Sequence, residues 1–536
     1  MEMRSLGTFL FLAMFFYWAS LPPLGGWSLA FVVPVLWTIL IRHPSALKYR
    51  YVYAATVVFW LASIWWIACP HPLTALGLIA LAAYLSIYWP LFLATSRVAV
   101  HQLRIPVIVA APLCWVGCEF LRNHVLGGFS FCALEHALYL KPKFLQIADI
   151  GGGYLVAAMI VAVGTGIGTL WPIQGAQKPT PAQWCAAILG IAAFLASAFY
   201  GHIRLAPRND ETAPLRIAAI QGNIPVSLKS LPQHPFEGLL QFTDLTAKAV
   251  ATKPDLIVWA ETVCPIPHFD IPEGDDPQTS FAREIADSWS GTFEIHLLSL
   301  LREIDTPTLI GLSTFRFEKN ATEPARLNSA LLIPRGAEMN GPRYDKVRLV
   351  MFGEYIPFSS FLPDDFFLKT LCVEATPGKE PVAIPVGDGY AAVNICFEST
   401  IPHWIREQVL TLKRQGTPPG LLINMSNDGW FRFSQQIDQH LATHVFRAIE
   451  NGLPYVTATN GGFSAIIDKQ GRIQKIGTRR AAEAVVGEVK LGHPNTLYHR
   501  VGDWPPLVCA IFVILFAMFG AGVPAKLLSC RHLKPE

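Results

Sequence analysis

The sequence predicts two kinds of structure in one chain: a multi-pass α-helical membrane domain and an α/β domain outside the membrane. Hydrophobic residues make up 52% of the 536 residues and charged residues only 15%, whereas soluble domains have about 25% charged residues. Apolar runs of membrane-spanning length are confined to residues 1–200 and to one run near the C-terminus. Residues 201–505 have an ordinary soluble composition, so the chain is expected to form more than one domain.

Eight apolar runs approach the roughly 20 residues that a helix needs to cross a bilayer. The first run follows a single basic residue, Arg4, and no small-residue cleavage site comes after it. We therefore predict an uncleaved helix and not a signal peptide. The predicted spans are 5–21, 25–41, 52–69, 72–94, 106–121, 152–171, 184–200 and 506–526. The predicted domains are a seven-span membrane domain (1–200), a catalytic domain (201–505), and a last helix with its tail (506–536).

The basic residues of the loops predict how the chain is oriented. With the N-terminus in the cytoplasm, the loops after spans two, four and six and the C-terminal tail carry most of the loop Lys and Arg, as the positive-inside rule requires. These residues are Arg42, Lys48, Arg50, Arg97, Arg104, Lys178, Lys526, Arg531 and Lys534. The third outer loop, with Arg122, Lys141 and Lys143, is a partial exception. Both termini are thus predicted to be cytoplasmic, and residues 201–505 to face outward, toward the periplasm of a bacterium.

The soluble part alternates short apolar runs with helical patterns. Nearly continuous apolar runs are typical of strands covered on both faces. The predicted strands are 215–225, 254–262, 307–315, 328–336, 390–399, 420–428 and 454–468, and the clearest helices are 236–252 and 435–452. This alternation predicts an α/β domain with layered sheets. The net charge of +3 gives no indication of a nucleic-acid partner.

The cysteines and histidines do not form a metal pattern. Ten cysteines are present, none in a CxxC pair, so neither a disulfide framework nor a zinc site is predicted; a bridge between Cys264 and Cys372 stays open. His440 and His444 have i, i+4 spacing but lack the acid of an HExxH motif. We predict no metal and no cofactor.

Two features of the spans allow more than one interpretation. Glu119 and Arg122 lie at the outer end of span five, where ionisable groups often have a function, but they can equally pair with each other. The tryptophans of the spans are predicted to lie at the membrane interface and to face lipid. They are Trp18, Trp27, Trp65, Trp66 and Trp89.

Three polar side chains follow apolar runs at points where a site can be built. Glu261 ends LIVWAE, Lys346 lies in DKVRLVMFGEYIPF, and Cys396 ends AVNIC. A thiol has a pKa near 8.5 and needs a base or a cation to become a good nucleophile. Glu261 can take its proton, and Lys346 can stabilise the oxyanion that forms when sulfur attacks a carbonyl. The product is a thioester, which an amine or water can open.

Together with AAIQGNIPVSLK, ICFES, NMSNDGWF and QHLATHVFRAIENG, these motifs resemble the Glu-Lys-Cys triad of the nitrilase (carbon–nitrogen hydrolase) superfamily. Over nearly its full length the chain resembles the bacterial apolipoprotein N-acyltransferases. The resemblance implies a layered α-β-β-α nitrilase-like domain, with Cys396 as nucleophile, Glu261 as general base and Lys346 as oxyanion stabiliser. It further implies that Glu354 positions groups or shares proton transfer, and that Glu398 supports the triad.

The resemblance also implies the substrates. The acyl donor is a membrane phospholipid, and the acceptor is the N-terminal amine of the diacylglyceryl-cysteine of a lipoprotein. The enzyme is expected in the bacterial inner membrane as a monomer. Ala260, Ser230, Arg348 and Met351 depart from the family pattern without touching the triad, and Phe131 departs in the loop after span five. Two alternatives are a membrane-anchored amidase or nitrilase that hydrolyses a small amide, and a non-catalytic membrane scaffold.

Overall fold

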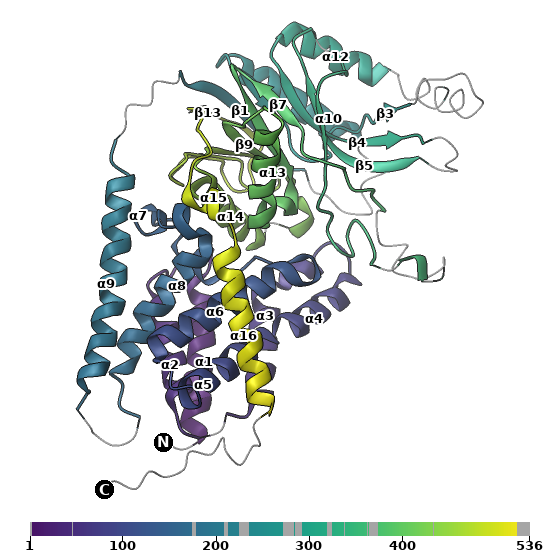
Figure 1. Cartoon of the computed structure of the whole chain (residues 1–536). Helices are drawn as coiled ribbons and strands as arrows, with labels where there is room; N and C mark the ends of the chain where they lie inside the picture. Colours follow the sequence, from purple (N-terminus) through teal and green to yellow (C-terminus); the bar gives the residue numbers. More distant parts are fainter. Residues whose placement is uncertain are drawn as a thin grey trace, which may run out of the picture. The chain divides into compact units, whose positions relative to one another are not determined.

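The structure is a computed structural model that divides into two compact units (Figure 1). It describes residues 3–45, 47–173, 178–207, 213–224, 235–271, 284, 292–318, 324–336, 338–357, 359–361, 363, 374–432 and 434–522. The helical unit comprises Met1–Ala68, Pro72–Pro207 and Thr496–Glu536, and the α/β unit comprises Cys69–His71 and Arg208–Asn495. The tail residues Lys526, Arg531 and Lys534, together with Ser230 and Cys372, lie outside the described residues.

The helical unit has a helix at each predicted span. Its helices are α1 (Met3–Ser20), α2 (Leu29–Arg42), α3 (Tyr49–Ser63), α4 (Thr74–Leu85), α5 (Tyr88–His101), α6 (Val107–His124), α7 (Pro142–Leu145), α8 (Ala148–Thr169), α9 (Pro181–Arg204), α15 (Leu497–Val501) and α16 (Trp504–Gly522). By length and composition, four helical segments in the described part of the chain can cross a membrane: Thr74–His101, α8, α9 and α16. Leu6–Ser20 and α2 are shorter apolar helices. The full set of eight spans stays a prediction.

Aromatic side chains form the interior of this unit. The rings of Trp37 and Trp115 lie 4.4 Å apart, those of Tyr17 and Phe59 lie 5.2 Å apart, and Trp89 contacts all four. The prediction that Trp89 lies at the interface or faces lipid is therefore wrong, since only 2% of its surface is exposed. Trp66 is likewise buried. Large rings stabilise a bundle interior by burying apolar area and by edge-to-face contacts. The sequence pattern does not distinguish tryptophans that pack in the interior from those that face lipid or the interface.

Glu119 and Arg122 pair with each other, as one of the two interpretations of the sequence predicts. The guanidinium of Arg122 contacts the Glu119 carboxylate and also donates to the carbonyls of Phe129 (2.7 Å) and Phe131 (2.9 Å). Both charged side chains are buried, and a buried charge is tolerated when it is paired and hydrogen-bonded. The pair fixes the loop that follows α6.

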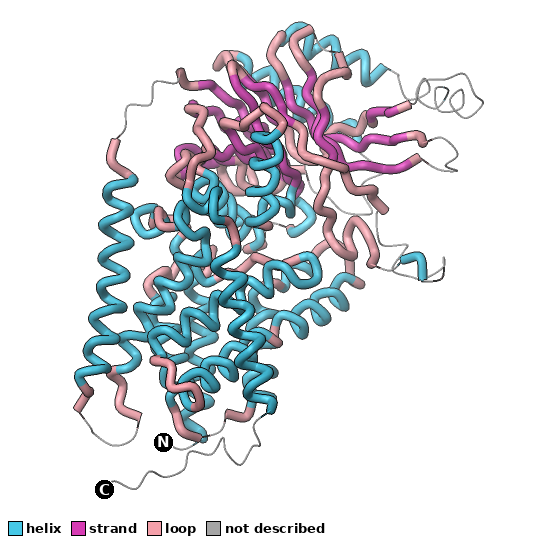
Figure 2. Tube along the Cα trace, viewed as in Figure 1, coloured by secondary structure: helices cyan, strands magenta, loops and turns pink. Residues whose placement is uncertain are grey.

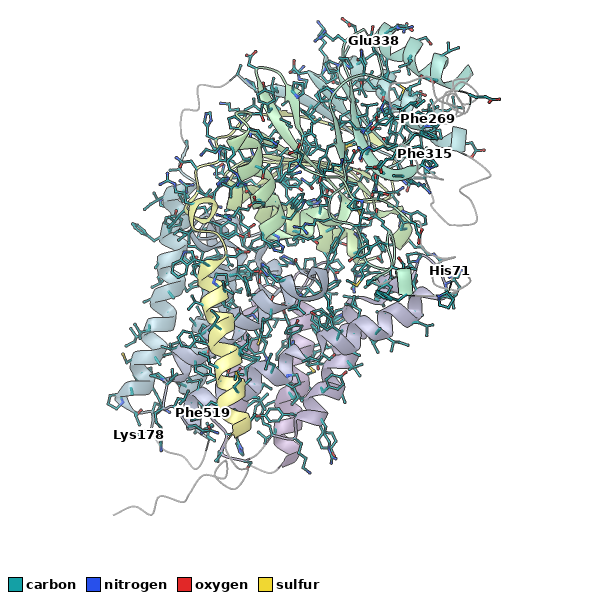
Figure 3. All side chains as sticks on the ribbon, turned by 45° about the vertical axis from the view of Figure 1, so that its right-hand side comes forward. His71, Lys178, Phe269, Phe315, Glu338 and Phe519 are labelled. Carbon is teal, nitrogen blue, oxygen red and sulfur yellow. The ribbon has the colours of Figure 1, made fainter. Side chains whose placement is uncertain are left out.

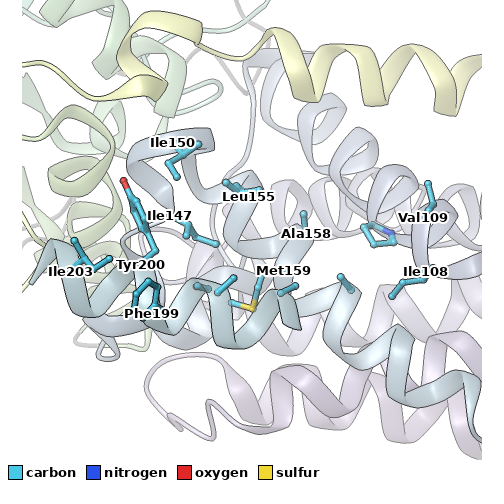
Figure 4. Close-up of a pocket in the computed structure, with 15 residues that line it drawn as sticks. Ile108, Val109, Ile147, Ile150, Leu155, Ala158, Met159, Phe199, Tyr200 and Ile203 are labelled. Atoms are coloured by element: carbon cyan, nitrogen blue, oxygen red, sulfur yellow. The ribbon is translucent and has the colours of Figure 1, made fainter. Parts of the chain in front are cut away.

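A mostly apolar cavity of about 750 Å³ lies between α6, α8 and α9 (Figure 4). Gly166 and Gly190 allow α8 and α9 to approach closely at one end, since a Cβ on either would lie within 2.8 Å of backbone. Near the other end, the hydroxyl of Tyr200 donates to Asp149 at 2.9 Å. Between these contacts, side chains such as Met159 line the cavity.

Two sheets form the centre of the α/β unit (Figure 2). The first has the strand order β13-β1-β2-β4-β5-β6, with β3 paired to β4, and the second has the order β12-β11-β10-β9-β8-β7. The first contains β1 (Leu215–Gln221), β2 (Leu256–Val258), β3 (His268–Asp270), β4 (Thr308–Arg316), β5 (Ala325–Ile333), β6 (Arg343–Asp345) and β13 (Glu483–Val489). The second contains β7 (Ala383–Val386), β8 (Gly389–Ile395), β9 (Leu421–Asn427), β10 (Tyr455–Asn460), β11 (Ala465–Ile467) and β12 (Ile473–Ile476).

The sheets pack face to face, and helices cover their outer faces. Buried side chains of β1, β2 and β4 meet those of β8, β9 and β10 in one core cluster. A second cluster joins the other face of the first sheet to α10 (Pro235–Val250) and α12 (Thr292–Ile304). Helices α13 (Pro402–Arg414) and α14 (Gln436–Asn451) contact the second sheet. This confirms the predicted α-β-β-α sandwich.

Short strand β3 extends the first sheet at the end of β4. Phe269 on β3 and Phe315 on β4 stack with ring centroids 6.0 Å apart, and Figure 3 shows both rings on the same part of the sheet. Cross-strand aromatic pairs of this kind stabilise pairing. The strand was not predicted, because three residues carry too little periodicity to be recognised.

Candidate active site

Cys396 begins a sharp turn at the end of a buried strand. β8 ends at Ile395, and a 3₁₀ helix, η5 (Cys396–Thr400), follows at once. The backbone of Cys396 is left-handed, with φ = +51°, which is uncommon for a residue other than glycine. Strained backbone of this sort persists where the surroundings impose it, often at functional sites. The half-buried thiol is free and lies at the edge of the core between the sheets.

Glu261 follows β2 and is held by the second sheet as well as the first. Its Oε2 accepts the backbone N–H of Asn427 at 2.9 Å, and its Oε1 accepts the amide of Asn328 at 2.7 Å. Gly311 on β4 makes this path possible, since a Cβ there would lie 2.3 Å from the carbonyl oxygen of Ala260. The carboxylate is therefore fixed between the two sheets.

Lys346 comes directly after β6 and is almost fully buried. Its Nζ lies 2.8 Å from Glu354 Oε1 and 3.3 Å from Glu261 Oε1. Burial disfavours the charged ammonium, but the charges of Glu354 and Glu261 outweigh burial and hold the pKa of Lys346 well above its ordinary value. Lys346 is thus a cation shared by two carboxylates.

Glu354 and Asn328 complete this group. Glu354 Oε2 accepts the backbone N–H of Val350 at 2.8 Å, which fixes the loop that carries both Lys346 and Glu354. The amide of Asn328, on β5, donates to Glu261 at 2.7 Å and to Glu354 at 3.3 Å. Sequence reasoning missed Asn328, because it lies inside an apolar run and no local pattern marks it.

Glu398 joins the Cys396 turn to the Lys346 loop. Its carboxylate accepts the backbone N–H groups of Val347 (2.9 Å), Arg348 (2.8 Å) and Ile395 (2.8 Å) and the hydroxyl of Tyr344 (2.8 Å to each oxygen). It is fully buried. Burial raises the pKa of Glu398 even though these donors favour the carboxylate. Its backbone contacts lie on both sides of the site, and its side chain thereby joins the two loops.

The electrostatics keep the Cys396 thiol neutral at rest. Burial and the negative charge of Glu261 raise its pKa well above the ordinary value, and the positive charge of Lys346 acts in the opposite direction. A thiol in this state needs a base to become a nucleophile. The structure therefore brings Cys396, Glu261, Lys346 and Glu354 into one electrostatic group.

Two other positions from the sequence analysis have structural roles. The guanidinium of Arg348 lies 4.8 Å from the ring centre of Trp404, a cation–π contact, so this departure from the family pattern packs beside the loop and does not take the place of Glu261, Lys346 or Cys396. His440 Nδ1 lies 3.2 Å from Asp428 Oδ1, and its Nε2 lies 2.8 Å from Ser399 Oγ.

Comparison with known proteins agrees with this fold. A family model described as carbon–nitrogen hydrolase matches residues 216–493, which is more than half of the chain. The α/β unit is therefore a carbon–nitrogen hydrolase domain. A second family model, described as the apolipoprotein N-acyltransferase N-terminal domain, matches residues 13–166.

Curated relatives narrow the class to one family. The apolipoprotein N-acyltransferase of Geobacter metallireducens is 33% identical over 426 residues, covering 79% of this chain and 76% of the relative. That of Rhodopirellula baltica is 27% identical over 534 residues, covering 91% and 92%. The chain belongs to the apolipoprotein N-acyltransferase family. Among solved structures, the C. elegans NitFhit protein matches at 14% identity and a TM-score of 0.37, covering 59% of this chain and 66% of its own.

Proposed function

We propose that this chain transfers an acyl chain from a membrane phospholipid, through a thioester on Cys396, to the N-terminal amine of the diacylglyceryl-cysteine of apolipoproteins. One observation carries the proposal: a free thiol on a left-handed turn lies in the field of a base, Glu261, and a cation, Lys346. The chain that presents this thiol belongs to the apolipoprotein N-acyltransferase family.

In the first half-reaction, Glu261 takes the thiol proton as sulfur attacks the ester carbonyl of the phospholipid. The described contacts engage two of the three N–H donors of Lys346, and the third is directed at the developing oxyanion. The C–O bond then breaks, and the proton passes from Glu261 to the alkoxide of the departing lysophospholipid. The product is an acyl thioester.

In the second half-reaction, the acceptor amine attacks the thioester carbonyl and gives a proton to Glu261. The C–S bond breaks, the thiolate regains that proton, and an amide remains on the lipoprotein. Glu354 holds Lys346 at 2.8 Å and keeps the ammonium in place through both steps, while Glu398 fixes the two loops. This is a two-step scheme with a covalent intermediate.

We infer the same setting for the enzyme as the sequence predicts: the bacterial inner membrane, with the catalytic domain on the periplasmic side, both termini in the cytoplasm, and a monomer as the working unit. Basic loop residues on one side of the predicted spans support this orientation. The four described helical segments of spanning length support the membrane assignment.

The test is intact mass spectrometry of the purified protein after incubation with phospholipid vesicles. The wild type is compared with Cys396→Ala and with Cys264→Ala, which removes another thiol of the α/β unit. We expect one added acyl chain, labile to hydroxylamine, in the wild type and in Cys264→Ala only, and its loss when a diacylated lipopeptide with a free N-terminal cysteine is added. A folded wild type that gains no adduct contradicts the proposal. Hydrolysis of a small amide in its place would favour the amidase alternative.

A further inference from the structure

A buried asparagine, Asn460, joins the two sheets of the α/β unit beside the proposed base. It is the last residue of β10, and only 1% of its surface is exposed. Its Oδ1 accepts the backbone N–H of Ile224, and its Nδ2 donates to the carbonyl of Ile224, both at 2.9 Å. The same Nδ2 donates to Asn427 Oδ1 at 2.9 Å. Ile224 follows β1 of the first sheet, whereas Asn427 ends β9 of the second, so one side chain bonds to both sheets.

The amide of Asn460 has one orientation that satisfies these contacts. Both hydrogens of Nδ2 are engaged, one by Ile224 and one by Asn427, and Oδ1 faces an N–H. A rotated amide would place Nδ2 against the N–H of Ile224 and Oδ1 against two oxygens. The backbone of Gly222 also lies close, since a Cβ there would be 2.7 Å from Asn460 Oδ1. The side chain of Asn460 is therefore fixed by its neighbours.

Asn427 is the residue through which Asn460 reaches the base. The backbone N–H of Asn427 donates to Glu261 Oε2 at 2.9 Å. In the described strand pairing, β8 accompanies β9 up to Met425, and β10 accompanies it up to Asn427, which is paired with Asn460. The end of β9 is thus held from the side of β10, and the bond from Asn460 to the Asn427 side chain fastens this last pair. The N–H that contacts Glu261 belongs to the residue that Asn460 holds.

We propose that Asn460 is a positioning residue for the base: it fixes the end of β9, so that the Asn427 N–H keeps Glu261 where it can take the thiol proton. The inference rests on the proposed function in taking Glu261 as the base and Cys396 as the nucleophile. The amide of Asn328 holds the other carboxylate oxygen, so loss of Asn460 leaves the base present but free to move at Oε2. A general base acts only within hydrogen-bond reach of the proton that it takes, and a displaced carboxylate therefore slows activation of the thiol.

The test measures how fast an ester acylates Cys396 in the full chain. The probe is p-nitrophenyl hexanoate, an activated ester whose acyl group passes to a thiol with release of coloured p-nitrophenolate, so that no phospholipid is needed. The burst of p-nitrophenolate gives a rate constant and a half-saturating ester concentration, and the burst of Cys396→Ala is subtracted. Acylation by phospholipid vesicles is followed in parallel by intact mass spectrometry.

Three variants remove the contact, and a fourth is a matched control. Asn460→Ala removes every hydrogen bond of the side chain, whereas Asn460→Asp keeps an acceptor for the Ile224 N–H but cannot donate to Asn427. Asn427→Ala removes the same contact from the other side and keeps the backbone N–H, so the test stands even if the Asn460 variants do not fold. Asn451→Ala is the control, since Asn451 is equally buried and its amide donates to the carbonyl of Arg447 at 2.9 Å.

We expect the three variants to lower the rate constant about fivefold to tenfold, the effect of one lost hydrogen bond. The half-saturating ester concentration should stay at the wild-type value, because the change affects the chemical step and not binding. Asn451→Ala should change neither quantity. The inference is overturned if Asn427→Ala or Asn460→Asp keeps the wild-type rate constant, if the half-saturating concentration changes in place of the rate constant, or if Asn451→Ala slows the burst as much.

The two esters separate this inference from the proposed function. A wild type that reacts with the activated ester but not with phospholipid refutes the proposed function, and the variants still decide the role of Asn460. A wild type that reacts with neither ester overturns both, because Glu261 then activates no thiol.

Discussion

Lys346 Nζ lies 2.8 Å from Glu354 Oε1, closer than it lies to Glu261 Oε1 at 3.3 Å. The buried ammonium of Lys346 therefore pairs with Glu354 at least as closely as with the proposed base, Glu261. This arrangement keeps Lys346 charged, and the longer of its two contacts is the one to Glu261.

The first prediction concerns Lys346→Met. It leaves the carboxylates of Glu261 and Glu354 facing Asn328 without a cation, so we expect loss of acylation and a free energy of unfolding lower by about 3–5 kcal/mol, as for other broken buried pairs. The measurement is chemical unfolding of the full chain in micelles. Lys248→Met, which breaks an exposed pair with Asp244, is the control and should cost no more than about 1 kcal/mol. Equal losses would contradict the prediction.

The second prediction concerns how the difference in the free energy of unfolding between the wild type and Lys346→Met depends on pH. The folded pKa of Lys346 is raised, so its contribution to stability is complete below the unfolded pKa of about 10.4 and is lost only as pH rises through the higher folded pKa. The Lys346 contribution to the stability difference between wild type and Lys346→Met should thus be constant from about pH 7 to about pH 9. A difference that shrinks across this window would show that Lys346 is not held as a cation.

The third prediction concerns Glu261→Gln, which keeps the shape of the side chain and removes the base. The thiol of Cys396 then stays protonated, because burial still raises its pKa. We expect acyl-enzyme formation to slow by about 10²–10⁴-fold, the usual contribution of a general base. Single-turnover mass spectrometry gives this rate. Glu303→Gln, on the exposed face of α12, should leave it unchanged, and a similar fall in both variants would refute the role of Glu261.

Sequence patterns located the long buried strands but not the sheet edges. The predicted strand 420–428 corresponds to β9, Leu421–Asn427, which is buried throughout. Edge strands β7 and β12 and short strands β3 and β6 were not predicted, because three or four residues with mixed exposure give no period to recognise. β13 was missed because its exposed and buried residues do not alternate cleanly.

The residues of the candidate site also fall into two groups: those that the sequence indicates and those that only the structure reveals. Glu261, Lys346 and Cys396 follow apolar runs, and their types suggest chemistry, so the sequence indicates them. Asn328 and Asn460 have ordinary side chains whose importance comes only from what lies opposite them across long sequence separations, 67 residues between Asn328 and Glu261. Glu398 was predicted to support the triad, but most of its partners are backbone N–H groups, which no side-chain pattern identifies.

A fourth prediction tests Asn328. In Asn328→Ala, Glu261 and Glu354 each lose a hydrogen-bond donor in a buried site. We expect a loss of about 1–3 kcal/mol in the free energy of unfolding and slower acylation, since Glu261 is no longer fixed. Asn340→Ala, at an exposed position where the amide contacts Glu338, is the control and should change neither quantity. Normal acylation by Asn328→Ala would show that Asn427 alone orients the base.

The last prediction concerns Glu398→Gln. The Glu398 carboxylate accepts N–H groups on both oxygens, so an amide nitrogen in either place would face a donor. We expect acyl transfer to slow. We also expect the free energy of unfolding to fall by at least about 1.5–3 kcal/mol, the contribution of one hydrogen bond to a charged group. Glu380→Gln, whose carboxylate is exposed and contacts Gln415, should match the wild type.

The same variant has an expected pH dependence. Because the folded pKa of Glu398 is raised, its titration favours the folded state below the unfolded pKa of about 4.3, and this contribution falls as pH rises through the folded pKa. The gap between wild type and Glu398→Gln should therefore be wider in mild acid than at neutral pH, and a gap that narrows in acid would mean that the carboxylate is the form the fold prefers.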